Sequence, residues 1–416
     1  MPVSMSYSFT EAVLNRKPIE QAFKRDPILR NVFSKMHKVA ADGLTNVVPV
    51  VMGNTFDWNV KGSTGAIPTT GTLITAQGSV TNYTLLSTIE LDNDDYKKMQ
   101  KLPQDQLTLR VNEVSDMISN SLAGAFERKL LGKSNDRLCY VVSDGATPSV
   151  LTLYGFDGDQ LPASHPAWDL IRVGAGTDAN SARYDLVGDA NGTDPDADGL
   201  NFYITAINRA AGTVTASAAI TAAAPATYIL RRYAPTQADG TVSVTYSGVY
   251  DVTGTASYLG LAPSTAGYEA WAGPVVNAAS NPLSMIHIAE AGQYLDSKDA
   301  VLLCDPGALA QMDAGVQKFV TTMTNGLGFT ERVYADGVFS LKLLPSRWLL
   351  GTGDAFIVQP EYWSIAGSVL MPEFTYPNFQ AKTGYDFVYN TLRVRGNFVC
   401  RKRSSVVRIY GLTQAF

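Results

Sequence analysis

The stretch NTLRVRGNFVCRKRSSVVRIYGL, residues 390–412, alternates apolar and polar side chains close to the end of the chain. Because successive side chains of a strand point to opposite faces, the alternation predicts a strand with one apolar face. The apolar face holds Leu392, Val394, Phe398 and Cys400, and the opposite face holds Arg393, Arg395, Asn397 and Arg401. Residues 402–405 are typical of a turn, after which Val407 and Ile409 begin a second strand. The stretch therefore predicts an ordered β-hairpin and not a basic tail.

The composition indicates a large core and an unusually uncharged surface. The chain has 416 residues, of which 45% are apolar and 17% are charged. Single cores stop growing at about 250 to 300 residues, so we expect at least two domains. Typical soluble domains hold about 25% charged residues. A lower fraction is found where other subunits cover the surface, and also in β-rich proteins of modest polarity. Composition leaves both interpretations open.

Charge is distributed unevenly along the sequence, whose net charge is −5. Residues 1–40 hold seven Lys or Arg against three acids, and residues 381–416 hold seven against Asp386 alone. Residues 141–280 hold thirteen acids, five arginines and no lysine. Basic ends and an acidic middle predict two different environments. The ends lack aromatic residues interleaved with the arginines and any DNA-reading motif, so only non-specific contact with phosphates is expected.

Cysteine usage and the absence of apolar runs indicate a chain made in a cytoplasm. Cys139, Cys304 and Cys400 are far apart and odd in number, which fits buried thiols better than a disulfide framework. The start, MPVSMSYSF, has no basic n-region and no apolar h-region, so we expect no secretory signal. No run approaches the roughly 18 apolar residues of a membrane helix, and we expect no membrane partner.

Two elements are predicted in the first third of the chain. Residues 54–80 are rich in Gly, Thr and Ser, and the strand-like TNYTLLSTIEL follows them, which predicts a long two-stranded finger. A helix is predicted over 104–131 because apolar side chains recur at steps of three and four, with Gly132 as its C-cap. The expected core of this helix is Leu107, Val111, Val114, Ile118 and Leu122.

The remainder is predicted to be mostly strand, with two helices. Residues 140–255 are typical of β structure, and the NRAAG at 208–212 predicts a hairpin turn. A helix is expected from Asn281 to Leu295, followed by the strand AVLLCDP and a short helix over 308–319. Frequent turns are expected over 322–353.

The sequence has no convergent catalytic set, and we expect neither an enzyme nor a cofactor. His37, His165 and His287 lie in three separate segments, where structural roles are favoured over catalysis or metal binding. Asp194, Asp196 and Asp198 match the opening of a calcium loop, but its twelfth position is Thr205 and not Glu. This triplet is a weak calcium candidate, and a solvated acidic loop is the favoured interpretation.

The order of elements resembles a known family. It runs through a basic arm, a finger, a long helix ending in FERKLLGKS, then NPLSMIHIAEAGQYLDSKDAVLLCDPGAL and a closing LRVRGNFVCRKRSSVVRI. This order resembles that of the major capsid proteins of tailed bacteriophages, which have the Hong Kong 97-like α+β fold. The match covers roughly residues 1–139 and 256–416. Residues 140–255 depart from the minimal form and look like the β-rich insertions of some capsid proteins.

The resemblance implies a division of the chain into named parts. They are an N-terminal arm over 1–50, an extended loop over 51–90, a peripheral domain with the spine helix over 91–139, a β-rich insertion domain over 140–255, an axial domain with part of the peripheral domain over 256–374, and C-terminal strands of the peripheral domain over 375–416. The extended loop contains Trp58 and Lys61. Some family members crosslink a lysine of this loop, but we expect Lys61 to be solvated and unlinked.

The resemblance also implies a function and partners. The chain is expected to assemble with itself into hexamers and pentamers of an icosahedral virion capsid, built in the host cytoplasm around double-stranded DNA. Scaffolding and portal proteins are implied partners, with cement proteins as a further candidate. The residues expected to face DNA or a neighbouring subunit are Arg16, Lys17, Lys24, Arg25, Arg393 and Arg395. The acidic insertion is expected on the outside. The alternatives are an encapsulin-like nanocompartment shell and, less favoured, a surface-layer or adhesin-type β protein.

Overall fold

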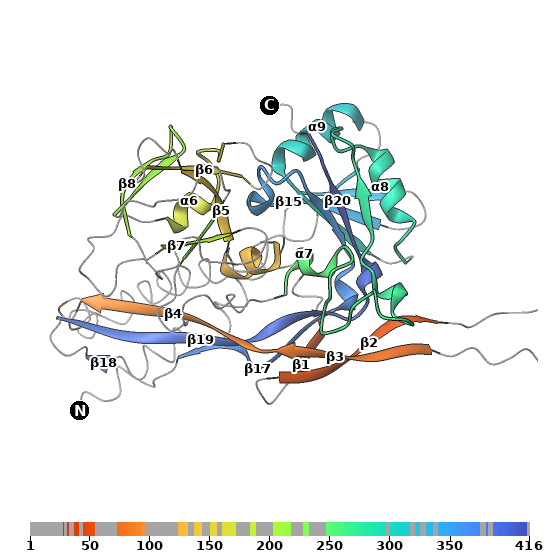
Figure 1. The fold of residues 1–416 in the computed structure, drawn as a ribbon, viewed down its shortest axis with the longest axis horizontal. Coiled ribbons are helices and arrows are strands. Elements are labelled where there is room, and N and C mark those ends of the chain that lie inside the picture. The colour runs from red at the N-terminus through yellow and green to blue at the C-terminus, as the bar shows by residue number, and fades with distance from the viewer. Residues whose placement is uncertain are drawn as a thin grey trace, which may run out of the picture. The chain divides into compact units, whose positions relative to one another are not determined.

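The part of the chain that the structure describes folds into several β-sheets with a few short helices (Figure 1). The computed structural model describes residues 28, 31–32, 37–40, 45–54, 73–92, 94, 97, 124–131, 137–143, 150–155, 160–171, 184–188, 203–217, 228–232, 247–296, 299–316, 321–324, 330–335, 340–374, 380–381 and 386–413. Within these residues, the strands form four sheets. The fold is therefore mixed α and β, as the sequence predicts.

The chain divides into two compact units, each built from three separate segments. The first unit comprises Met1–Glu127, Thr255–Ala272 and Pro360–Arg403. The second comprises Arg128–Gly254, Gly273–Gln359 and Ser404–Phe416. Because the chain passes repeatedly between the units, neither can be completed until the C-terminal part has been made.

The predicted terminal strand is the centre of the main sheet of the first unit. It is β19 (Phe387–Cys400), which pairs with β17 (Trp363–Phe374) and β18 (Gln380–Ala381) along one edge and with β4 (Tyr83–Asp92) along the other. The β4 ladder runs from Asp92–Phe387 to Tyr83–Gly396 without a register shift. A short strand, β1 (His37–Ala40), lies parallel to β17 at the edge of the sheet.

The predicted terminal hairpin is wrong, because the two strands belong to different sheets. After β19, the 3-10 helix η5 (Arg403–Ser405) redirects the chain, and β20 (Val406–Tyr410) joins the large sheet of the second unit. Arg403 is only 1% exposed, and its Nη1 donates to the main-chain oxygen of Ala256 at 2.9 Å. The expected turn exists at this point, but its buried arginine anchors the chain and no hairpin forms.

The predicted faces of β19 are confirmed in part. Phe398 and Cys400 are fully buried and Arg393 is exposed, as alternation requires. Asn397 is a correction, because it was expected on the polar face but is 3% exposed. Its Nδ2 donates to the main-chain oxygen of Thr81 at 2.9 Å, and its Oδ1 accepts from the Phe398 N–H at 2.8 Å. Both faces of β19 are therefore covered near its end.

A two-stranded hairpin is present where the finger was predicted, but its strands differ from the expected ones. It pairs β2 (Thr45–Asn54) antiparallel with β3 (Leu73–Thr81), with a register shift between Val51 and Gly53. The strand expected over 81–91 is β4 and belongs to the main sheet of the first unit. Trp58 and Lys61 lie outside the described residues.

The helix predicted over 104–131 is described only at its end. Residues 124–131 are helical, and Phe126, Leu130 and Leu131 are buried. The ring of Phe126 packs edge-on against Phe398 of β19, with centroids 5.9 Å apart. The predicted core residues Leu107, Val111, Val114, Ile118 and Leu122 lie outside the described residues. Within the described part of the chain, no helix is long and apolar enough to span a membrane.

The β structure predicted after residue 140 forms a sheet of its own. Its strands, in spatial order, are β7 (Tyr184–Gly188), β10 (Tyr228–Arg232), β5 (Arg137–Ser143), β6 (Val150–Tyr154), β9 (Thr213–Ala216) and β8 (Ile204–Asn208). The predicted hairpin is confirmed, because β8 pairs antiparallel with β9 around residues 209–212. The short helix α6 (Ala167–Leu170) places Trp168 in the core beside this sheet.

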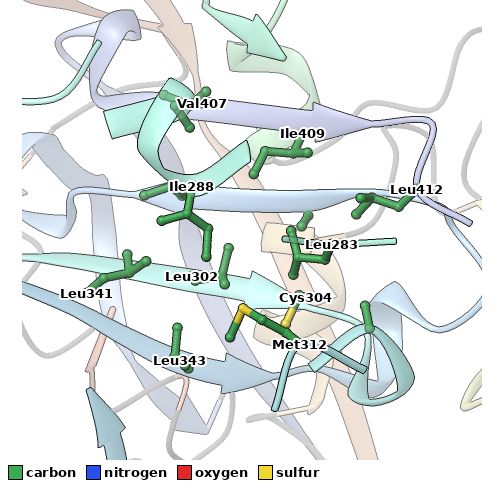
Figure 2. Packing of buried hydrophobic residues seen from close by; sticks show 14 of the residues in the cluster. Leu283, Ile288, Leu302, Cys304, Met312, Leu341, Leu343, Val407, Ile409 and Leu412 are labelled. Atoms are coloured by element: carbon green, nitrogen blue, oxygen red, sulfur yellow. The ribbon is translucent and has the colours of Figure 1, made fainter. Parts of the chain in front are cut away.

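A seven-stranded mixed sheet forms the other core of the second unit. Its order is β11 (Val275–Asn277), β20, β16 (Ala355–Val358), β12 (Ala300–Cys304), β15 (Ser340–Pro345), β14 (Thr330–Ala335) and β13 (Thr321–Thr324). Three of these strands replace the turns expected over 322–353, which is a correction. Strand β12 is buried at every position, and Leu302 and Cys304 meet Ile288 and Met312 in the core (Figure 2).

Three helices accompany this sheet. The predicted helix after Asn281 is confirmed as α8 (Met285–Gly292), and the one after β12 is confirmed as α9 (Pro306–Val316). Helix α9 begins where the carboxylate of Asp305 accepts from the Gly307 N–H. The short α7 (Val249–Val252) buries Val249 and Val252.

Candidate functional surfaces

Most residues singled out from the sequence lie outside the described part of the chain. These are Arg16, Lys17, Lys24, Arg25, Trp58, Lys61, Asp194, Asp196 and Asp198. The described residues contain no group of three or more His, Cys, Asp or Glu side chains that could hold a metal ion. Of the residues proposed to face DNA or a neighbouring subunit, the structure describes Arg393 and Arg395.

Arg393 and Arg395 occupy one face of β19. Arg393 is exposed and Arg395 is partly buried. They are two positions apart, so their α-carbons lie about 7 Å apart along the strand. Guanidinium groups bind phosphate and carboxylate oxygens in a bidentate manner. Glu373 of β17 lies opposite Arg393 in register, whereas Val369 lies opposite Arg395. Of the two, Arg395 is the better placed for an anionic partner.

Two other basic residues of the terminal segment, Arg403 and Arg408, make contacts inside the protein. The guanidinium of Arg403 lies over the rings of Tyr258 and Trp271, 5.7 and 5.9 Å from their centroids. Burial lowers the pKa of Arg403 from its ordinary value. Arg408 pairs with the buried carboxylate of Asp354. Fewer positive charges therefore reach the surface at this end of the chain than its seven Lys and Arg residues suggest.

Asp354 is the centre of a buried polar cluster. It accepts from Arg408 and also from the hydroxyl of Tyr250, at 2.8 Å. Burial, followed by the adjacent carboxylate of Asp354, raises the pKa of Tyr250 well above its ordinary value. The guanidinium of Arg408 also lies over the rings of Tyr250 and Tyr410. The two hydrogen bonds from Arg408 to Asp354 hold strand β20 beside the start of β16.

Two of the three histidines have local structural partners, as expected. The Nδ1 of buried His165 accepts from the Ala167 N–H at 3.1 Å, and its ring packs edge-on against Trp348. Burial, and then the charge of Arg347, lower the pKa of His165 to about 4. His287 caps α8, because its Nδ1 accepts from the Ser284 N–H at 3.3 Å. Both imidazoles act as hydrogen-bond acceptors for the main chain.

Among the described residues, the large apolar side chains that are exposed are Val47, Val275, Ile286 and Tyr294. Val47 on β2 is 64% exposed, and its strand neighbours Val48 and Val50 point to the buried face. Ile286 on α8 is 76% exposed, and Tyr294 just beyond the helix is 49% exposed. Sequence reasoning missed these positions because alternation and helical periodicity alone do not tell which apolar residues remain uncovered.

Comparison with known proteins finds similarity in structure but not in sequence. No protein-family model matches the chain, and no curated protein matches it. An encapsulin complex of Synechococcus elongatus is 8% identical, with 92% of this chain and 88% of that chain covered and a TM-score of 0.42. The procapsid of satellite phage P4 is 9% identical, with coverages of 96% and 100% and a TM-score of 0.41. The capsid of cyanophage A-1(L) is 10% identical, with 91% of both chains covered and a TM-score of 0.42. All three TM-scores are below 0.5.

Proposed function

We propose that this chain is the structural major capsid protein of a tailed phage, with the Hong Kong 97-like fold. It assembles with itself into hexamers and pentamers of an icosahedral head, built in the host cytoplasm, that encloses double-stranded DNA. It carries out no catalysis and needs no cofactor. Its further partners are scaffolding and portal proteins, with cement proteins as candidates.

The observation that carries this proposal is the order of elements along the chain. The β2–β3 hairpin, strand β4, the helix through 124–131, the α8–β12–α9 segment and the closing β19 follow one another in the order on which the sequence resemblance rests. In the proposed assignment, the first unit holds the arm, the extended loop and the peripheral sheet. The seven-stranded sheet of the second unit is the axial domain, and the β5–β10 sheet is the insertion.

Exposed apolar side chains and the scarcity of charge support self-association. Only 17% of the residues are charged, and Val47 and Ile286 remain largely exposed in the single chain. Interface cores are depleted of charge relative to the rest of a surface. In a closed shell the same contact repeats head to tail from one subunit to the next, and pentamers and hexamers are rings closed by such contacts.

The proposed DNA contact is electrostatic and independent of sequence. Basic side chains of the arm and Arg395 of β19 would face the packaged DNA, and the acidic residues 141–280 would face outward. Lysine and arginine bind DNA non-specifically by releasing counterions from its phosphates. A net charge of −8 over residues 141–280, from thirteen acids and five arginines, disfavours an inward position.

Electron microscopy of the protein, expressed alone and with its neighbouring genes, tests the proposal. Closed shells that protect double-stranded DNA from nuclease are the expected result. A single sharp monomer peak from folded protein at every salt and protein concentration would overturn it. Shells that enclose a protein cargo and no DNA would instead support an encapsulin-like nanocompartment.

A matched pair of variants tests the apolar surface. Val47→Asp adds a charge to an exposed position, so the monomer should keep its melting temperature while the yield of shells falls. Ser264→Asp adds the same charge at another exposed position of the first unit and is the matched control. If both variants assemble like the parent, Val47 does not lie in a subunit interface.

A further inference from the structure

Strand β4 has a long outer edge that no described strand covers. Its ten residues, Tyr83–Asp92, pair with β19 along one edge without a register shift (Figure 1). Among the residues that the structure describes, no strand pairs with the other edge of β4. Such an edge presents a row of main-chain N–H and C=O groups on which another strand can pair. Strand β4 is therefore a candidate site for the addition of a strand.

The strands on the opposite side of this sheet have features that hinder strand addition, whereas β4 does not. Strand β1 has four residues and β18 has two. Strand β17 has two register shifts against β19 and contains Pro372. Short strands, bulges, proline and lysine all hinder pairing at an edge. The β4 sequence YTLLSTIELD contains neither proline nor lysine, and its ladder has no bulge. A regular, unprotected edge of this length favours a partner strand.

The charges of β4 favour a second, antiparallel copy of the same strand as that partner. The charged residues of the strand, Glu90 and Asp92, both lie at one end. A second β4 that is parallel and in register would place each acid opposite its own copy, and like charges directly opposite each other destabilise a sheet. An antiparallel copy places both acids beside the uncharged end of the other strand. The strand is therefore complementary to itself in the antiparallel direction.

The two faces of the sheet limit the register of such a pair. On β19, Val388 and Asn390 are buried, so the β4 residues opposite them belong to the covered face. Because successive residues alternate between faces, this face of β4 is formed by Tyr83, Leu85, Ser87, Ile89 and Leu91. A two-fold axis perpendicular to the sheet keeps the covered faces of both copies on the same side. Residues that pair across such an axis must then belong to the same face.

We propose that the outer β4 edges of two copies of this chain pair antiparallel about a two-fold axis at Ser87. This register sets Tyr83 opposite Leu91 and Leu85 opposite Ile89, so that apolar residues meet apolar residues, and it sets Ser87 opposite itself. The contact is isologous, because both copies use the same surface. An icosahedral shell has two-fold axes at which such a contact can lie. The inference therefore names one contact of the proposed self-assembly and rests on that proposed function.

Disulfide formation in assembled particles tests this register. Ser87→Cys places two cysteines opposite each other, where the α-carbons of an antiparallel pair lie about 4.5 to 5.5 Å apart, a separation that a disulfide can bridge. After mild oxidation, a non-reducing denaturing gel should show a dimer band in place of the monomer band. Thr84→Cys is the matched control, because its two copies would lie about 20 Å apart along the strands. The parent should give no dimer band, because Cys139, Cys304 and Cys400 are buried.

A second variant and a second measurement keep the test decisive. If Ser87→Cys does not assemble, the double variant Leu85→Cys with Ile89→Cys takes its place, because each cysteine again lies opposite one across the axis. Hydrogen exchange is then compared between the assembled and the unassembled parent chain. The outward-pointing amides of β4 should exchange roughly tenfold more slowly after assembly, because only the second copy protects them.

The outcomes separate this contact from the proposed function. Particles with the parental melting temperature but no dimer band would overturn the β4 contact and leave the proposed shell intact. Equally slow exchange of β4 before and after assembly would also overturn it, because a segment of the same chain would then cover the edge. Crosslinked dimers that never close into shells would support the contact and count against the proposed function.

Discussion

Arg408 on β20 donates two hydrogen bonds to the carboxylate of Asp354, from Nε to Oδ1 at 2.9 Å and from Nη2 to Oδ2 at 3.0 Å. The Asp354 side chain is 3% exposed and that of Arg408 is 29% exposed. A fork of this kind matches the plane of a carboxylate better than lysine can. Asp354 precedes β16, which pairs antiparallel with β20. The ion pair therefore joins the start of β16 to the middle of β20.

Breaking this pair from one side should destabilise the second unit. Arg408→Met leaves the carboxylate of Asp354 buried, with the hydroxyl of Tyr250 as its remaining side-chain donor among the described residues, and about 3 kcal/mol should be lost. Removing both charges in Arg408→Met with Asp354→Asn should recover part of this loss. Denaturant unfolding measures the free energies, and Arg393→Met on the exposed face of β19 is the control. A loss below about 0.5 kcal/mol for Arg408→Met, equal to the control, would contradict a structural ion pair.

Segments whose structure is decided locally could be predicted from the sequence. The β8–β9 hairpin follows from its turn, where the Asn208 side chain accepts from Ala211 and Gly212 has φ +64°. Helix α8 begins just after Ser284, which is a preferred N-cap residue. Strand β12 is apolar at every position because both of its faces are covered. In each case the deciding residues lie within a few positions of one another.

Segments decided by distant residues could not be predicted. The patterns of β19 and β20 favour two paired strands, but the burial of Arg403 against Tyr258 and Trp271 separates them. The sequence around Tyr258 and Trp271 does not indicate that either ring contacts Arg403. The close approach of Leu259 to Gly78 could not be predicted either: a β-carbon added at Gly78 would lie 2.9 Å from the Leu259 β-carbon. A glycine in a Ser- and Thr-rich stretch has no sequence signal that distinguishes it from a loop residue. Among the residues proposed to face DNA or a neighbouring subunit, only Arg393 and Arg395 lie in the described part of the chain, and Arg393 is exposed while Arg395 is partly buried. Their contact with DNA or a neighbouring subunit stays a prediction.

The same change should have very different effects on stability at two isoleucines of α8, Ile286 and Ile288. Ile288 is fully buried in the core shown in Figure 2, and Ile286 is 76% exposed. Ile288→Ala should lower the free energy of unfolding by about 2 to 5 kcal/mol, because it leaves a cavity. Ile286→Ala should change it by less than about 0.5 kcal/mol. Chemical denaturation of the unassembled chain is the measurement, and equal losses for the two variants would show that the helix is rotated from the described position.

A strained turn before α8 should be stabilised by glycine. Ala279 and Ser280 have φ angles of +50° and +61°, in the left-handed region that disfavours a β-carbon. Ala279→Gly should raise the free energy of unfolding by about 0.5 to 1 kcal/mol. The matched control is Ala289→Gly in the middle of α8, where glycine should lower it by about 1 kcal/mol. Thermal melting distinguishes the two, and a loss of stability in both variants would mean that the turn at 279 is not strained.

Arg395 should contribute to non-specific DNA binding if its face of β19 meets packaged DNA. Each phosphate contact adds about 0.9 to the slope of log affinity against log salt concentration. Arg395→Gln should therefore lower that slope by about 1 for any duplex sequence. Arg393→Gln is the comparison variant, and it should lower the slope less, because Arg393 lies opposite Glu373. Arg403→Gln is not a suitable control, because Arg403 is buried and structural. Equal slopes for parent and Arg395→Gln would remove Arg395 from the proposed DNA-facing set.

His165 should make the second unit sensitive to acid. Its folded pKa of about 4 lies below the ordinary 6.5, so the unfolded chain binds more protons between these values. Stability from this group is therefore complete above about pH 6.5 and is lost as the pH falls toward 4, by about 3 kcal/mol in all. A proton on His165 would face Arg347 and would displace the hydrogen bond from the Ala167 N–H. His165→Asn keeps an acceptor for that N–H but cannot titrate. Unfolding free energies at several pH values should fall less steeply for this variant than for the parent, and parallel pH curves would contradict the assignment.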